Sequence, residues 1–206
     1  MYYMQDERQE NFFVELIKYF VVAVIIVIPV RLWVAQPFVV SGESMEPTFD
    51  TGQYLIVDEL TYNISDPQRG DVVIFRYPLN TSEFFIKRII GLPGETLSID
   101  SLGVYIVGAN GSKTKISEPY LVNIGNGKAQ TITLKAGEYF VMGDNRPDSS
   151  DSRFWGSVPR SDIVGRAIAR LLPVSKISLL PGSLESFAKN AVNLPAATST
   201  RSVPAI

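Results

Sequence analysis

The stretch EFFIKRIIGLPGE, residues 83–95, joins a run of phenylalanine and isoleucine to two adjacent basic residues. Aromatic and β-branched residues favour strands, and successive side chains of a strand point to opposite faces. Phe85 and Lys87 therefore share one face of the predicted strand, whereas Ile86 and Arg88 share the other. One of the two cations must face apolar surroundings, unless the strand lies at the edge of a sheet.

Similar short apolar runs lie on both sides of this stretch, separated by Gly, Pro, Asn and Asp. GANG (108–111) and GNG (125–127) are typical of hairpin connections. Beyond residue 37, no run of ten or more residues has the pattern of an amphipathic helix. The sequence therefore predicts a mainly β body. The further predicted strands are QYLIVDEL (53–60), DVVIFRY (71–77), ETLSID (95–100), GVYIVG (103–108), QTITLKAG (130–137), EYFVMGDN (138–145) and DIVGRAIARLL (162–172).

A long apolar run, residues 16–35, precedes this body. It has the ~20 residues that a helix needs to cross a bilayer, with Lys18 and Arg31 near its ends. A buried core helix and a cleavable signal peptide are the alternatives, but the acidic start of the chain is unlike a signal peptide. We expect one uncleaved transmembrane helix after a short segment, residues 1–15. The flanking charges do not decide its orientation.

The C-terminal residues 174–206 are poor in charge and rich in Ser, Ala and Pro. We expect a loosely ordered tail there. A second membrane span is not expected, because Pro181, Glu185 and Lys189 interrupt the apolar residues.

Composition excludes several kinds of chemistry. The 206 residues include 19 basic and 21 acidic ones, for a net charge of -2, which argues against a nucleic-acid partner. The chain has no cysteine, so it has no disulfide and no thiolate nucleophile or ligand. It also has no histidine, which excludes a Ser-His-Asp triad and imidazole ligands for zinc. An acyl-transfer enzyme would need lysine, a carboxylate or an N-terminal amine as its base.

The stretch VVSGESMEPTF, residues 39–49, places Ser44 on a turn between two glutamates. Taken alone, it is most simply an ordinary turn serine. A nucleophile would need a base, and Lys87 is a candidate, because burial can lower the pKa of a lysine by up to ~3–5 units. At a pKa of about 8, roughly 9% of the amine is neutral at pH 7. The alternative is that Lys87 and Arg88 are gatekeeper charges on an edge strand.

The third candidate stretch is VMGDNRPDSSDSRFWG, residues 141–156. Its closely spaced carboxylates and guanidiniums favour a network of ion pairs that fixes a loop. Calcium is the alternative, but the glycine and closing glutamate of a calcium-binding loop are absent. We therefore expect no metal site.

Together, these stretches resemble the bacterial type I signal peptidases, the membrane-anchored Ser-Lys peptidases of the leader peptidase family. SGESMEPT, RGDVVIF, FIKRIIGLPGE and GDNRPDSSDSRFWG occur in the family's order, up to about Leu172. The resemblance implies a signal-peptidase-like extracytoplasmic β catalytic domain over residues 36–173. It also implies a small cap insertion at about 97–136.

The resemblance assigns a role to each catalytic residue. Ser44 matches the nucleophile, Lys87 the general base, and Ser149 the serine that orients the lysine amine. The oxyanion hole would use the Ser44 backbone N–H and a backbone donor at Gly42. Many family members have a serine at position 42, whose hydroxyl donates to the oxyanion. One such donor is worth about 2.7–4 kcal/mol in other serine proteases.

Other matches surround this site. Val40 and Ile86 correspond to positions that line the pockets for small substrate residues. The matches with a structural role are Met45, Pro47, Asp144, Asn145, Arg146, Asp151 and Arg153.

The implied function is removal of signal peptides from exported precursor proteins after small residues, of the Ala-x-Ala type, through an acyl-enzyme. No cofactor or metal is implied. The implied partners are signal-peptide-bearing precursors and the lipid bilayer, and a monomer is favoured. The resemblance also implies a single-pass protein of the cell membrane, with its N-terminus in the cytoplasm.

Three other functions are weighed against this one. A self-cleaving Ser-Lys regulator similar to SOS-type repressors would need a DNA-binding domain, and none is predicted. Penicillin-binding proteins carry their lysine three residues after the serine, where this chain has Pro47. A membrane-attached β-domain that only binds would not depend on the chemistry of Ser44 or Lys87.

Overall fold

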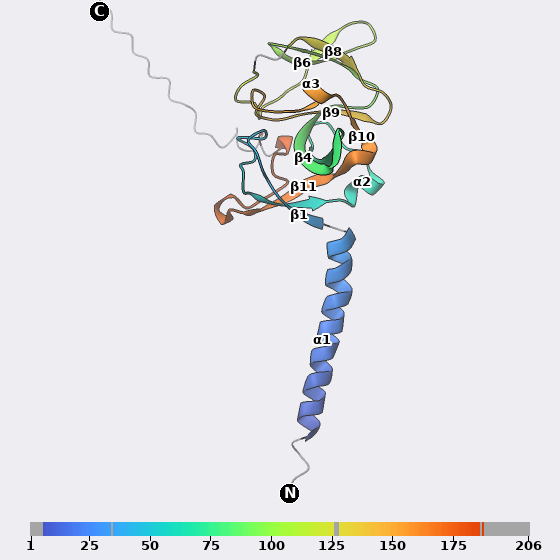
Figure 1. Cartoon of the computed structure of the whole chain (residues 1–206), viewed down its shortest axis with the longest axis vertical. Coiled ribbons are helices and arrows are strands. Elements are labelled where there is room, and N and C mark those ends of the chain that lie inside the picture. The colour runs from blue at the N-terminus through green and yellow to red at the C-terminus, as the bar shows by residue number, and fades with distance from the viewer. Residues whose placement is uncertain (1–5, 34, 126–127, 186, 188–206) are drawn as a thin grey trace, which may run out of the picture.

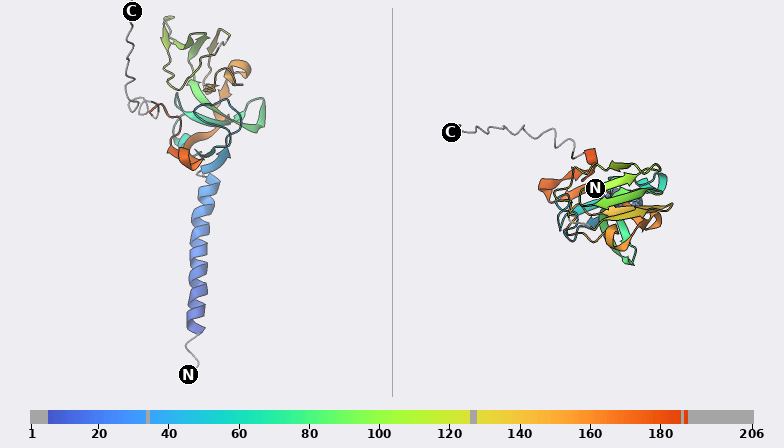
Figure 2. Two further views of the ribbon diagram at one scale, coloured as in Figure 1. Left: turned by 90° about the vertical axis from the view of Figure 1, so that its left-hand side faces the viewer. Right: turned by 90° about the horizontal axis from the view of Figure 1, so that it is seen from above.

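The computed structural model describes residues 6–33, 35–125, 128–185 and 187. A long helix, α1 (Asp6–Trp33), extends away from a β-rich body, as Figures 1 and 2 show. The predicted mainly β body is confirmed. Its helices are short: α2 (Thr61–Ile64), α3 (Ser152–Trp155) and the 3-10 turns η1 (Arg160–Asp162) and η2 (Val174–Lys176).

The larger sheet has eight strands in the order β1-β2-β11-β3-β4-β9-β10, with β12 paired to β11. Its ladders are antiparallel. The strands are β1 (Ala35–Val39), β2 (Tyr54–Asp58), β3 (Val72–Tyr77), β4 (Asn80–Gly91), β9 (Glu138–Met142), β10 (Val158–Pro159), β11 (Ile163–Leu172) and β12 (Ser178–Leu179).

The sheet curls until its distant strands meet. β1 and β4 are separated by three strands in the sheet order, yet the rings of Phe38 and Phe84 pack edge to face at 5.5 Å. Two cores fill the curled sheet. One surrounds Phe49, Leu55 and Val57, and the other surrounds Phe75 and Val141. The turn after β1 and the middle of β4 are thereby brought together.

A second, four-stranded sheet has the order β7-β6-β5-β8. Its strands are β5 (Thr96–Asp100), β6 (Gly103–Val107), β7 (Lys113–Lys115) and β8 (Gln130–Thr133). It occupies the segment in which the sequence predicts a small cap, and its core includes Leu97, Phe140 and Tyr120.

Each of the predicted strand runs overlaps one strand of the structure, and β4 begins at Asn80, before its predicted run. The short strands β1, β7, β10 and β12 were not predicted. The GANG segment forms the connection between β6 and β7, where the Gly108 N–H donates to Ser112 O and the Gly111 N–H donates to Gly108 O. The predicted GNG connection falls partly outside the described residues, which exclude 126 and 127.

The predicted transmembrane helix, residues 16–35, overlaps α1 but does not have its bounds. The helix starts at Asp6 and ends at Trp33, and Ala35 already belongs to β1. Side chains of α1 are described for residues 12–25. In the part of the chain that the structure describes, we find no helix both long and apolar enough to cross a membrane.

The C-terminal region also differs from the prediction. Residues 174–179 form η2 and β12 rather than a loosely ordered tail, because Ser178 and Leu179 pair with β11. The chain then turns back over the body, where Pro181 and Gly182 are buried. Residues 188–206 of the predicted tail lie outside the described residues.

Candidate active site

Ser44 and Lys87 lie side by side in the fold. The Nζ atom of Lys87 is 2.7 Å from Oγ of Ser44 and 3.0 Å from the backbone oxygen of Ile86. Lys87 comes from the middle of β4, and Ser44 from the turn that follows β1. The serine and the base that the sequence proposes for it are therefore within hydrogen-bond distance.

β4 pairs with β3 up to Arg88 and with β9 only from Arg88 onward, so Lys87 ends the free edge of β4 and Arg88 is the first residue with strands on both sides. The alternative of solvated gatekeeper charges is excluded by the burial of both side chains, not by strand pairing. Both cations are buried, on opposite faces: the Lys87 side chain is 4% exposed and that of Arg88 is 0% exposed.

Burial lowers the pKa of Lys87 to about 8, although the carboxylates of Asp151 and Asp144 act in the opposite direction. Desolvation disfavours the ammonium form, and no carboxylate oxygen is close enough to form an ion pair with this amine in the described part of the chain. A neutral amine next to a hydroxyl can accept its proton.

The turn that carries Ser44 is held by hydrogen bonds from the loop after β9. The backbone N–H of Asn145 donates to Ser44 O at 3.0 Å, and its side-chain amide donates to Glu43 O at 3.1 Å. The hydroxyl of Thr48 donates to Asp144 Oδ2 at 2.6 Å. Met45, 1% exposed, fixes the turn in the core.

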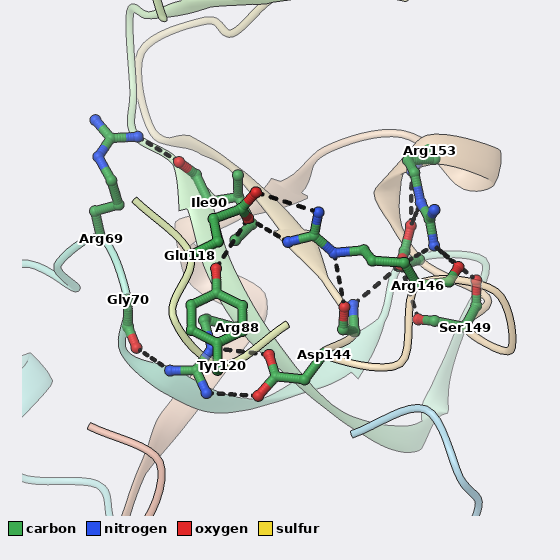
Figure 3. A network of polar contacts seen from close by, with 12 residues as sticks. Arg69, Gly70, Arg88, Ile90, Glu118, Tyr120, Asp144, Arg146, Ser149 and Arg153 are labelled. Carbon is green, nitrogen blue, oxygen red and sulfur yellow. Dashed lines mark hydrogen bonds and ion pairs between the residues drawn. The ribbon is translucent and has the colours of Figure 1, made fainter. Parts of the chain in front are cut away.

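Asp144 is in turn held by a buried ion pair with Arg88, whose Nε and Nη2 donate to its two oxygens at 2.8 and 2.6 Å (Figure 3). Such a bidentate pair fixes orientation as well as charge. Arg88 also donates to the backbone oxygen of Gly70 at 2.8 Å. Arg88, which follows the candidate base Lys87, thus orients the loop that holds the Ser44 turn.

A second group of ion pairs continues this network (Figure 3). Arg146 pairs with Glu118 and donates from Nε to Gly143 O at 3.0 Å. Arg153 donates to both oxygens of Asp151, at 2.7 and 2.8 Å, and Asp151 caps α3 by accepting from the Arg153 N–H. The Asp- and Arg-rich loop therefore has the paired arrangement that its sequence favours.

Ser149 is buried beside this network, but its hydroxyl donates to Asp151 Oδ2 at 2.8 Å. Within the described residues it has no hydrogen bond to Lys87. It lies close to the turn nevertheless, since a Cβ on Gly143 would be 2.3 Å from both Ser149 Oγ and Ser44 O. Only glycine permits this approach.

Gly42, the expected second oxyanion donor, has a φ of +95°. Its backbone N–H donates to Thr51 Oγ1 at 3.1 Å, and the Thr51 hydroxyl donates back to Gly42 O at 3.0 Å. The N–H of Gly42 is therefore engaged in this state. The N–H of Ser44 has no hydrogen-bond partner among the described residues and is available to an oxyanion.

A cavity of about 500 Å³ opens over Ser44 and Lys87. Val40 and Ile86, the predicted substrate-pocket residues, both line it, and Phe38 and Phe84 form part of its wall. It is bounded by β1 and the following turn on one side and by the outer part of β4 on the other.

Several residues that build the site were not singled out from the sequence. Thr48 and Thr51 have only ordinary turn signals. Tyr120 and Phe187, whose ring centres lie 3.9 and 5.8 Å from the guanidinium carbon of Arg88, gave no signal at all, since they act through contacts made in the folded chain. Arg88 was detectable, because strand alternation already placed one of the two adjacent cations against apolar side chains.

A serine hydroxyl beside a desolvated lysine amine, on a curled β-sheet with a cavity above it, defines the class of serine-lysine hydrolases. Comparison with known proteins narrows the class. The family described as "Signal peptidase, peptidase S26" matches residues 13–172. The chain therefore belongs to the signal peptidase family S26.

Individual relatives are similar to most of the chain. A protein named "Probable signal peptidase I-2" from Synechocystis is 37% identical, over 88% of this chain and 83% of its own length. Signal peptidase I of Bacillus caldolyticus is 36% identical, over 76% of this chain and 90% of its own. The crystal structure of a signal peptidase I from Enterococcus faecalis is 37% identical, covers 50% of this chain and 97% of that one, and gives a TM-score of 0.42.

Proposed function

We propose that this chain is a serine endopeptidase that removes N-terminal signal peptides from exported precursor proteins, with Ser44 as nucleophile and Lys87 as general base. The observation that carries the proposal is the 2.7 Å separation between Lys87 Nζ and Ser44 Oγ, two residues that line one cavity. Family membership supports the reaction, and the geometry supports the two residues.

The neutral amine of Lys87 takes the hydroxyl proton of Ser44 while Oγ attacks the carbonyl carbon of the scissile peptide bond. The resulting ammonium then protonates the leaving nitrogen, so that the mature protein departs and an ester to Ser44 remains. Lys87, neutral again, activates a water molecule, whose oxygen attacks the ester. The signal peptide leaves as a carboxylate and Ser44 regains its proton.

The pKa of Lys87 suits this role. With a pKa of about 8, roughly a tenth of the amine is neutral at pH 7. An exposed lysine would be neutral in only about 0.04% of molecules at that pH. Burial in β4 therefore raises the population of the reactive form by a factor of about 200.

The open strand edges offer a way to bind substrate. β1 pairs with β2 alone, and the outer part of β4, before Arg88, pairs only with β3 among the described strands. These unpaired edges face the cavity from two sides. We infer that an extended segment of the precursor lies between them, because a free edge can add a strand. Val40 and Ile86 would then contact its small side chains.

Ser44 N–H is the donor that we assign to the oxyanion. Gly42 contributes as well only if its N–H leaves Thr51 when substrate binds. Ser149 supports the site through Asp151 in this state, since its hydroxyl bonds to that carboxylate. Arg146 and Arg153 hold the same loop.

We also propose that α1 attaches the protein to a membrane, with the N-terminus in the cytoplasm and the β-body outside. Its described side chains include many large apolar ones that are about half exposed or more, which is costly in water. These are Phe12, Phe13, Val14, Leu16, Ile17, Tyr19, Phe20, Val21, Val22 and Ile25. Flotation with liposomes tests this: the full chain should float, and a chain starting at Gln36 should not.

The reaction is tested with detergent-solubilised protein and a secretory precursor that carries an Ala-x-Ala site. Wild type should cut once, and sequencing of the product should place the new N-terminus directly after that site. Ser44→Ala should leave the precursor intact. If wild type binds several precursors but cuts none, the chain is a binding module and the proposal fails.

A further inference from the structure

The chain beyond the family match reaches back to the active site. The match ends at residue 172, but residues 180–185 and 187, here called the C-terminal strap, pack on the body. Gly182 is buried, and its backbone oxygen accepts from Arg88 Nη1 at 2.5 Å. Phe187 packs against the ring of Tyr120, with the two ring centroids 6.0 Å apart.

The strap completes the enclosure of Arg88. The guanidinium carbon lies 3.9 Å from the ring centre of Tyr120 and 5.8 Å from that of Phe187. Its donors are shared between Asp144, Gly70 O and Gly182 O, and the side chain is 0% exposed. Figure 3 shows Arg88 behind Tyr120 with its bonds to Gly70 and Asp144. Without the strap, one donor would lose its partner and water would reach the ion pair.

This ion pair is linked to Ser44 and Lys87 through neighbouring residues. Arg88 follows Lys87 in β4, and Asp144 holds the Ser44 turn through the hydroxyl of Thr48. The next residue, Asn145, donates from its backbone to Ser44 O. A buried ion pair keeps its geometry only while its remaining donors are satisfied and water is excluded.

We propose that Gly182 and Phe187 are positioning residues of the active site. They exclude water from the Arg88–Asp144 ion pair and thereby hold Ser44 within hydrogen-bond distance of Lys87. The inference rests on the proposed function, because its readout is the cleavage reaction. It extends the catalytic unit beyond the segment that the family model matches.

Gly182 offers a sharp test with a matched control. Its φ is +76°, and an added Cβ would lie 2.8 Å from Thr48 Cγ2 and 3.0 Å from Phe49 Cε2. Gly137 has a φ of +75°, with nothing within 4 Å of an added Cβ. Gly182→Ala and Gly137→Ala therefore carry the same backbone strain, but only the first pushes the strap away from the Ser44 turn.

We expect both variants to lose thermal stability from the strained φ, and Gly182→Ala to lose more because its Cβ also crowds Thr48 and Phe49. At a temperature where wild type and both variants are folded, Gly182→Ala should lower kcat at least about 10-fold with KM within about twofold, since small displacements of reacting groups are costly. Gly137→Ala should keep the wild-type kcat. Equal kcat for both variants, or a loss in KM alone, would overturn the proposal.

A second pair of variants covers the case in which Gly182→Ala does not fold. Phe187→Ala should lower kcat in the same way, and Phe187→Leu should restore most of it by covering Arg88 again. Full activity in Phe187→Ala would overturn the proposal. A wild-type protein that cuts no precursor would instead refute the proposed function, so the two failures are distinguishable.

Discussion

The amine of Lys87 lies 2.7 Å from the hydroxyl oxygen of Ser44, although 43 residues separate the two in the sequence. β1 and β4, which position them, are not neighbours in the sheet. The contact therefore exists because the sheet curls and closes its two open edges around one cavity. Neither strand could form the site without this curvature.

The rate of cleavage should follow the deprotonation of Lys87. Its pKa of about 8 predicts that kcat/KM rises about tenfold per pH unit below pH 8 and levels off above it. The profile is measured with a peptide substrate that has no group titrating between pH 6 and 10. A flat profile across pH 6–8 would contradict the assignment of Lys87 as the base.

The buried lysine should also destabilise the fold at neutral pH. Its pKa is about 8 in the folded chain against 10.5 for the ordinary group, so the unfolded chain binds more protons between these values and stability rises with pH there. Lys87→Met should be inactive but more stable at pH 7, by up to about 3 kcal/mol. Urea unfolding should show this difference shrinking from pH 8 to pH 10.5. A less stable variant at pH 7 would argue that the amine contributes more by bonding than it costs by burial.

Breaking the buried ion pair should be severe. Arg88→Ala leaves the Asp144 carboxylate buried without its cation, which costs about 3–5 kcal/mol. Lys135→Ala is the control, because that exposed lysine lies 3.9 Å from Glu138 and such pairs contribute about 0–1 kcal/mol. Chemical unfolding measures both. Similar losses for the two variants would refute the structural importance of the Arg88–Asp144 pair.

Thr51 should tune catalysis through Gly42. Thr51→Val keeps the shape of the side chain but removes both hydrogen bonds to Gly42. We expect kcat to fall several-fold, because the turn before Ser44 loses the two hydrogen bonds that fix Gly42. Thr51→Ser should restore kcat, since it keeps the hydroxyl. If Thr51→Val instead raises kcat, the released Gly42 N–H serves as an oxyanion donor. An unchanged kcat would exclude a role for Thr51 in the site.

The strand pattern could be predicted from the sequence because alternating and β-branched runs are local signals. In β4 the run 84–90 carries this signal, and the alternation of Phe85, Lys87 and Ile89 predicted which side chains share a face. The short strands β7, β10 and β12 escaped prediction, since two or three residues carry no period. The bounds of the N-terminal helix also differed from the prediction. Ala35 joins the sheet by pairing with Asp58, a partner that composition cannot reveal.

The site was predictable to the extent that chemistry limited it. Without histidine or cysteine, lysine was among the few bases left for Ser44, and the family's motifs pointed to the same pair. The contacts that support these two residues from behind, such as those around Arg88, were not predictable. The bond between Gly182 and Arg88 spans 94 residues and has no local signature in either partner. The segment around Gly182 looked like a tail because its few apolar residues have no periodicity.

The most direct test of the Ser44–Lys87 assignment is the initial rate of precursor cleavage by Lys87→Ala at pH 8, compared with wild type at equal concentrations of folded protein. The assignment predicts that cleavage falls to the level of Ser44→Ala, because among the described residues no side chain other than Lys87 is hydrogen-bonded to Ser44 Oγ. Cleavage by Lys87→Ala at a rate near that of wild type would contradict it.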